Sequence, residues 1–248
     1  MATGYRNHRS VRNYTNEKIT DELLQDIFAA GIRASTTGNM QLYSVVVTRD
    51  DNMKKKLAPC HFNQSMVLQA PVLLTFCADI NRFSQWCTYS DADPGYNNFL
   101  WFINATIDVL LVAQNMCVAA EEKGLGICYL GTTLYTAEKI IDILSLPRGV
   151  FPVTAVVMGY AADKAPLTDR LPMEAVIHYE KYNNYTADDI RRFYAAKEAL
   201  PSTLDLLKQN NKQRLAQVFT DNRYKKEDNI KYSEELIRVL RKQGFVQS

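Results

Sequence analysis

The sequence lacks the motifs of several common classes of active site. Its three histidines form neither an H-E-x-x-H motif nor a cluster with cysteines, so the ligands of a zinc site are missing. Neither a G-x-S-x-G nucleophile elbow nor a Walker A sequence occurs. The glycines of residues 124–131 have the wrong spacing for a dinucleotide fingerprint, and the segment does not lie between a strand and a helix. An enzyme with this sequence would therefore take its reactive group from a cofactor.

Cysteines and long apolar runs are also scarce. The five cysteines are odd in number and form no C-x-x-C pair, which argues against a disulfide framework and a zinc ribbon. Cys77, Cys117 and Cys128 lie in apolar stretches and are predicted to fill the core. The first ten residues contain no apolar segment, and no run of 18 apolar residues occurs. We therefore expect a cytoplasmic protein.

The chain has no large excess of either charge. A formal net charge of +2 over 248 residues excludes a histone-like protein that coats nucleic acid through its basic excess. The total conceals an asymmetry, because residues 1–180 carry a net charge of −3 and residues 181–248 a net charge of +5. The basic end is either a solvated helical surface or a surface that attracts an anionic ligand, and the sequence leaves both interpretations open.

Hydrophobic periodicity predicts an α+β chain. The segment 70–79 is apolar at successive positions, so it should be a central strand covered on both faces. The apolar segment 99–123 raises the alternative of a membrane span, but interruptions such as Asn104 and Asp108 favour a core helix. We expect a core over residues 1–185 and, in the same domain, a helical extension over 186–248. The predicted strands are 43–48, 70–79, 126–131 and 151–160, and the predicted helices are 20–34, 99–123, 137–145, 188–199, 202–218 and 227–242.

The N-terminal segment gives the first positive signal for a ligand. Arg6, Arg9 and Arg12 lie within the first 16 residues together with His8 and Ser10, and this stretch contains no acidic residue. Guanidinium forks, an imidazole and a hydroxyl are donors that suit the oxygens of a phosphate. A disordered basic leader would have the same composition, so the cluster by itself does not distinguish the two.

Five blocks in a fixed order make the sequence recognisable, and together they resemble the FMN-dependent nitroreductase family. The resemblance is strongest to its longer branch of NADPH-dependent oxygen-insensitive nitroreductases and flavin reductases, and it covers residues 8 to about 185. It implies a central, mostly antiparallel sheet flanked by helices, with a helical C-terminal extension that embraces a dimer partner. The blocks are HRSVRNYTNEKIT (8–20), STTGNMQLYSVVV (35–47), NQSMVLQAPVLLTFCAD (63–79), GLGICYLG (124–131) and ADKAPLTDRLP (162–172).

The resemblance also implies a flavin site, residue by residue. His8, Arg9 and Ser10 match the motif that holds the FMN phosphate and ribityl chain. Arg12 matches an arginine beside the pyrimidine end of the ring, where a cation stabilises the charge of the reduced flavin. The other matched positions are Thr36, Gln64, Leu130, Gly131, Thr132 and Arg170, with Asn39, Gln41 and Lys164 as secondary candidates.

One position departs from the pattern of the branch. Where its members often have a lysine, this chain has Thr168, followed by Asp169. Phosphate binding would then depend more on Arg9 and Arg170, with Lys164 as a candidate substitute for the lysine. Arg170 is alternatively a surface loop residue, and Asn39 and Gln41 are equally well explained as loop-capping amides.

The activity that the resemblance implies is a two-step oxidoreduction. NADPH or NADH delivers a hydride to N5 of FMN and leaves, and a nitroaromatic, quinone or flavin is then reduced at the same place. No side chain is expected to act as a nucleophile, and the small-molecule acceptor is not specified. Alternatives are a flavin reductase that supplies free reduced FMN, a specialised reductase such as a dehalogenase, and a non-catalytic protein that binds FMN or nucleic acid.

The resemblance further implies a homodimer with FMN at the interface, and neither a nucleic-acid partner nor a membrane partner is expected. The basic extension would help to hold the 2′-phosphate of NADPH. No motif determines which residues do so, and a solvated helix face explains the basic residues equally well. The candidates are Arg214, Arg223, Lys225 and Lys226.

Overall fold

A computed structural model describes residues 7–246, which form two compact units. The first unit comprises residues 7–167 and 234–246, and the second comprises residues 168–233. The predicted division into a core over 1–185 and an extension over 186–248 stays a prediction. Arg6 of the predicted N-terminal cluster lies outside the described residues.

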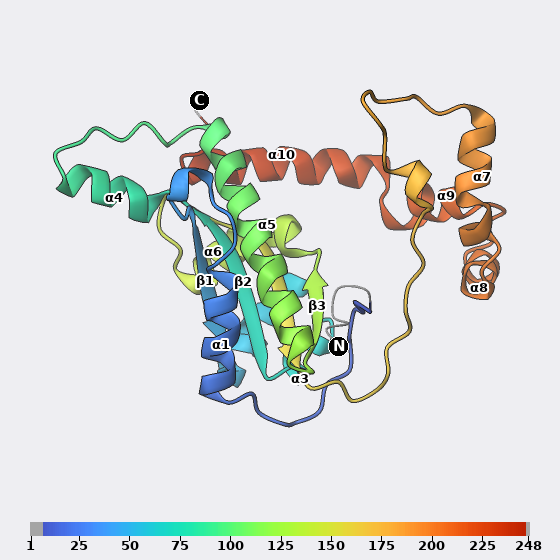
Figure 1. Cartoon of the computed structure of the whole chain (residues 1–248), viewed down its shortest axis with the longest axis horizontal. Helices are drawn as coiled ribbons and strands as arrows, with labels where there is room; N and C mark the ends of the chain where they lie inside the picture. The colour runs from blue at the N-terminus through green and yellow to red at the C-terminus, as the bar shows by residue number, and fades with distance from the viewer. Residues whose placement is uncertain (1–6, 247–248) are drawn as a thin grey trace. The chain divides into compact units, whose positions relative to one another are not determined.

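A four-stranded sheet forms the centre of the first unit (Figure 1). Its strand order is β1-β2-β4-β3, and every neighbouring pair is antiparallel. The register between β2 and β4 shifts at Phe76 and Cys77, opposite Pro152, which has no N–H to donate and is therefore accommodated at an irregularity. All four predicted strands and the antiparallel sheet are confirmed. The strands are β1 (Tyr43–Thr48), β2 (Val72–Asp79), β3 (Gly126–Leu130) and β4 (Val150–Gly159).

Helices cover both faces of the sheet. Leu74 and Phe76 of β2 pack into one apolar cluster with residues of α1 and α5, whereas Leu73 packs into a second cluster with residues of α2, α3 and α6. Every residue of β2 is buried, so the strand is central and covered on both faces, as its sequence predicts. The helices of this unit are α1 (Asp21–Gly31), α2 (Asp51–Leu57), α3 (Met66–Gln69), α4 (Asn81–Tyr89), α5 (Phe99–Glu122) and α6 (Ala137–Leu144).

The long helix α5 runs along one face of the sheet beside α1 (Figure 1). The side chain of Asn98 accepts a hydrogen bond from the N–H of Trp101 and caps its N-terminus. In the described part of the chain, α5 is the one helix long and apolar enough to cross a membrane. Within the fold, 44% of its most apolar 18-residue stretch is buried. Val109, Val112 and Ala113 are among its fully buried residues. Its packing against the sheet is that of a core helix.

The C-terminal end of the chain packs into the core of the first unit. Helix α10 (Lys226–Lys242) begins in the second unit, and its residues from 234 onward belong to the first. Leu240 and Phe245 join the cluster formed by α1, α5 and the sheet. The amide of Gln243 donates to the carbonyl of Val150 at 2.8 Å, which fastens the chain end to β4.

The second unit contains the predicted basic helices. A reciprocal capping box between Thr186 and Asp189 begins α7 (Ala187–Glu198). The prediction of a single helix over 202–218 is wrong, because two separate helices occupy this segment, α8 (Pro201–Gln209) and α9 (Leu215–Val218). Between them, Asn211 adopts a left-handed conformation. The short 3-10 segments of the chain are η1 (Thr37–Asn39), η2 (Ala58–His61), η3 (Thr133–Thr136) and η4 (Met173–Ala175), and η5 (Phe219–Arg223) is π-helical.

The sequence analysis missed three short helices, α2, α3 and α4. Asn81 and Arg82, which follow the predicted strand 70–79, begin α4. The Asp79 carboxylate accepts a hydrogen bond from the N–H of Arg82 at 3.1 Å, so the last residue of β2 stabilises the first turn of the helix. The Asp50 side chain caps α2 in the same way.

Candidate functional site

The N-terminal segment is fixed against the edge of the sheet. Ser10 forms a parallel bridge with Ile127 of β3, and the N–H of Val11 donates to the Ile127 carbonyl at 2.9 Å. A Cβ atom added at Gly126 would lie 2.6 Å from the Val11 side chain, so only glycine permits this close approach. The predicted phosphate-binding motif is therefore held by backbone pairing to β3.

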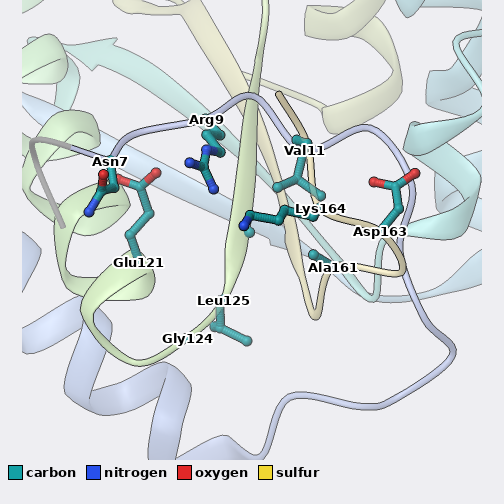
Figure 2. Close-up of a pocket in the computed structure, with 11 residues that line it drawn as sticks. Asn7, Arg9, Val11, Glu121, Gly124, Leu125, Ala161, Asp163 and Lys164 are labelled. Carbon is teal, nitrogen blue, oxygen red and sulfur yellow. The ribbon is translucent and has the colours of Figure 1, made fainter. Parts of the chain in front are cut away.

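Beside this segment lies a cavity of about 410 Å³ (Figure 2). Arg9 and Val11 line it, whereas His8, Ser10 and Arg12 do not. In a segment paired to a strand, successive side chains point to opposite sides, which explains the separation. The structure thus brings Arg9 and Lys164 to one cavity. The other three predicted residues lie elsewhere along the segment.

Two cationic side chains, Arg9 and Lys164, extend toward the middle of this cavity (Figure 2). The Nε atom of Arg9 is buried and has no hydrogen-bond partner among the described residues. Asp163, on the same wall, already accepts a hydrogen bond from Asn13 at 2.6 Å. Burying an unpartnered guanidinium N–H is unfavourable, so an anionic ligand in the cavity would stabilise it.

His8 contacts the end of α5. Its Nδ1 lies 2.9 Å from Oε1 of Glu121, and the two side chains are 27% and 11% exposed. The other carboxylate oxygen of Glu121 is buried without a partner in the described structure, and Glu121 also lines the cavity. The sequence analysis did not identify Glu121, and no motif in the sequence indicated it.

Ser10 and Arg12 lie near the Cys128 thiol. Burial raises the pKa of Cys128, while Arg12 and a hydrogen bond with Ser10 act in the opposite direction. Burial also raises the pKa of Cys117, to about 12. Thiols of this kind stay protonated at neutral pH and are poor nucleophiles, so neither cysteine offers covalent catalysis. Both are buried, as the sequence predicts.

The C-terminal end of β3 presents an open backbone. Leu130 is buried, but a Cβ atom added at Gly131 would meet no atom within 4 Å. The hydroxyl oxygen of the next residue, Thr132, lies 3.0 Å from Nδ1 of His61. The space beside Gly131 is what a flat ring would need in order to lie against the strand end.

Gln64 lies in a strained turn next to this strand end. Its amide donates to the His61 carbonyl at 3.0 Å, and the two residues between them, Phe62 and Asn63, both have positive φ angles. Burial lowers the pKa of His61 to about 4, so this histidine is neutral at pH 7. His61 therefore connects Gln64 with Thr132. The sequence signal was the position of His61 two residues before the matched block 63–79.

Thr36, Asn39 and Gln41 occupy a separate loop. The hydroxyl of Thr36 donates to the buried Asp108 carboxylate at 2.5 Å and accepts from the N–H of Gln41 at 2.9 Å. Asn39 and Gln41 adopt left-handed conformations, and the guanidinium of Arg82 donates to the Gln41 carbonyl. The three loop residues line a cavity of about 520 Å³ that shares no residue with the Arg9 cavity.

The remaining predicted residues belong to the second unit. The guanidinium of Arg170 donates to the Thr168 hydroxyl at 2.7 Å and to the Asp169 carbonyl at 2.9 Å. Thr168, which stands where the branch often has a lysine, therefore binds Arg170. In the basic extension, Arg214 forms an ion pair with Glu198 at 3.6 Å. Arg223 lies over the Phe219 ring, and Lys226 begins α10.

No group of His, Cys, Asp or Glu suited to a metal ion occurs among residues 7–246. The residues present fit a phosphate-bearing flavin, because the Arg9 cavity offers a buried guanidinium Nε with no partner among the described residues and Gly131 leaves space at the strand end. The fold and the site thus define an α+β protein of the flavin-binding class.

The chain belongs to the nitroreductase family, whose family model matches residues 5–160. It is 55% identical to a structurally characterised Bacteroides fragilis protein, with 98% of each chain covered and a TM-score of 0.96. It is 34% identical to the FMN reductase (NADPH) of Bacillus subtilis, with 75% of each chain covered. It is 35% identical to the oxygen-insensitive NADPH nitroreductase of Salmonella typhimurium, with 71% of each chain covered.

Proposed function

We propose that this protein is an FMN-dependent oxidoreductase that uses NAD(P)H to reduce nitroaromatics, quinones or flavins. The observation that carries the proposal is the buried Nε of Arg9, which has no hydrogen-bond partner in the described structure. Arg9 lines the same cavity as Lys164. The names of the B. subtilis and S. typhimurium relatives support the same chemistry. Relatives with enzyme names do not favour the non-catalytic alternative.

Each part of the site has a role toward the cofactor in this proposal. Arg9 and Lys164, which line one cavity, neutralise the phosphate. His8, Ser10 and Arg170 stay candidates through the sequence resemblance. Arg12 supplies positive charge at the pyrimidine end of the ring. When bound, FMN supplies the hydride transfer from the nicotinamide to the acceptor.

The other matched residues shape the surface on which the ring and the substrates stack. Gly131, between Leu130 and Thr132, lets the flat ring approach the backbone because no Cβ atom occupies that space. Gln64 is held in a turn by its hydrogen bond to the carbonyl of His61, whose ring contacts Thr132. His61 is neutral and Cys128 is protonated at pH 7, so neither of these two side chains adds a charge or a nucleophile to the site.

We further propose that the protein is a homodimer and that the second copy completes the flavin site. The loop that carries Thr36, Asn39 and Gln41 lines a different cavity from Arg9, so a second copy offers the means to bring the two together. An exposed apolar row on α5 supports self-association, because apolar side chains in a continuous row favour burial. The row comprises Leu100, Ile103, Ile107, Leu110 and Leu111, which are 40% to 64% exposed.

The proposal extends to the electron donor and to the compartment. The basic extension would contribute to the 2′-phosphate site of NADPH, with Arg214, Arg223, Lys225 and Lys226 as candidates. The buried free cysteines agree with a reducing cytoplasm. No nucleic acid and no membrane has a role in this proposal.

The decisive experiment is a visible spectrum of the purified protein followed by an anaerobic NADPH titration. We expect a yellow protein that is bleached by NADPH. A colourless protein that takes up no added FMN would contradict the proposal. Steady-state rates with free FMN and with a nitroaromatic then distinguish the alternatives, because a flavin reductase that supplies free reduced FMN would strongly prefer free FMN.

A further inference from the structure

The wall of the Arg9 cavity contains acidic as well as basic side chains. Arg9 and Lys164 share it with Asp163 and Glu121. A carboxylate beside two cations is expected to form an ion pair with one of them, because opposite charges attract. Neither Arg9 nor Lys164 forms an ion pair with any residue in the described part of the chain. Glu121 is engaged by His8, whose Nδ1 lies 2.9 Å from its Oε1. Asp163 needs a separate explanation.

Asn13 holds the carboxylate of Asp163. The side-chain amide of Asn13 donates a hydrogen bond to Oδ2 of Asp163 at 2.6 Å. Figure 2 shows the Asp163 carboxylate directed away from the guanidinium of Arg9 and from Nζ of Lys164. The two cations extend into the middle of the cavity, whereas the adjacent anion does not.

The backbone places Asn13 next to Asp163. The N–H of Ala162 donates to the Asn13 carbonyl at 2.9 Å, and Tyr14 forms an antiparallel bridge with Ala161. The bond between the side chains of Asn13 and Asp163 is the next contact after this pairing. It therefore orients the carboxylate at the point where the loop leaves the N-terminal segment.

We propose that Asn13 is a positioning residue that keeps the Asp163 carboxylate away from the two cations of the cavity, so that both stay free to bind the flavin phosphate. The inference rests on the proposed function, because the phosphate is that of FMN. Asn13 itself does not line the cavity. Its effect on the ligand passes through Asp163.

A rescue experiment separates this role from simple bracing of the loop. Without Asn13, the Asp163 carboxylate turns toward Lys164 and competes with the phosphate for its charge. Removing that carboxylate as well ends the competition, so the affinity returns. If Asn13 only braces the loop, a second substitution at Asp163 restores nothing, because the bond is already lost. The two mechanisms predict different affinities for the same double variant.

The test uses the full chain freed of cofactor and titrated with FMN and with riboflavin, which lacks the phosphate. We expect Asn13→Ala to raise the FMN dissociation constant about fivefold, the effect of one competing surface ion pair, and to leave the riboflavin constant unchanged. Adding Asp163→Asn to this variant should restore the affinity that Asp163→Asn has alone. Asn16→Ala is the matched control, because this exposed asparagine lies in the same segment, and it should alter neither constant.

Asp163→Asn alone keeps the inference testable if Asn13→Ala fails to fold. It should bind FMN at least as tightly as wild type, because it removes an anion from the cavity wall. Weaker FMN binding by Asp163→Asn, an unchanged FMN constant in Asn13→Ala, equal losses for both flavins, or a double variant as weak as Asn13→Ala would overturn the inference. A wild-type protein that binds no FMN would contradict the proposed function itself.

Discussion

The buried carboxylate of Asp108 accepts a hydrogen bond from the hydroxyl of Thr36 at 2.5 Å, across 72 residues of sequence. It also accepts from the N–H groups of Thr37 at 2.9 Å and Leu42 at 3.2 Å. One side chain of α5 therefore holds both ends of the loop that carries the predicted residues Asn39 and Gln41. The donor of Thr36 is used within the chain, which leaves its oxygen to contact a ligand only as an acceptor.

Asp108→Ala should destabilise the protein strongly. The substitution leaves the N–H groups of Thr37 and Leu42 without an acceptor, so we expect the free energy of unfolding to fall by about 3 kcal/mol in urea denaturation at pH 7. Asp26→Ala is the control, because Asp26 pairs with Lys123 at the surface and should cost less than about 1 kcal/mol. Similar losses for the two variants would contradict a structural role for Asp108.

Arg9→Ala should release FMN without unfolding the chain. Arg9 lines the candidate phosphate cavity and makes no hydrogen bond among the described residues that its loss would break. We expect at least about a tenfold weaker FMN affinity, measured by flavin fluorescence, with an unchanged circular dichroism spectrum. Lys56→Ala removes an exposed cation from α2 and should retain flavin. Stoichiometric flavin in Arg9→Ala would count against this phosphate site.

Phe245→Ala should destabilise the protein, because the C-terminal end of the chain belongs to the core. Phe245 is fully buried, and its ring centroid lies 5.2 Å from that of Phe102 in α5. We expect a loss of about 4 kcal/mol, because truncation removes apolar contacts and leaves a cavity. Tyr89→Ala, at a side chain that is 84% exposed, should change stability by less than about 0.5 kcal/mol. Thermal unfolding that does not distinguish the two variants would refute the prediction.

His61 should make stability depend on pH. Burial lowers its pKa from the usual 6.5 to about 4, so between these values the unfolded chain binds a proton that the folded chain does not. The associated stability is present above pH 6.5 and is lost as the pH falls toward 4. Between pH 7 and pH 4.5, wild type should lose about 2 kcal/mol more than His61→Asn.

Urea denaturation of both proteins at several pH values measures the difference. From pH 8 to pH 7 the two curves should run in parallel, because His61 is neutral in both the folded and the unfolded chain over most of that range. Parallel curves down to pH 4.5 would contradict the effect of burial on the pKa of His61.

The main elements of the fold follow from local signals. Successive apolar residues in β2 and an apolar run in α5 indicate burial by themselves, so both were predicted close to their observed bounds. The short helix α4 was missed because its first turn is stabilised by Asp79, a residue that also reads as the end of a strand. The break between α8 and α9 depends on the left-handed Asn211, a conformation that periodicity does not reveal.

The sequence by itself determined the order of the strands along the chain, the absence of a metal or nucleophile motif, and the blocks that resemble the nitroreductase family. Those features are local or depend on residue type. Only the tertiary structure decided that Arg9 and His8 belong to different surroundings, that Asp108 holds Thr36, and that Phe245 is buried. The physical reason is that each of these contacts joins segments far apart in the chain, and no short-range period encodes which side chains meet.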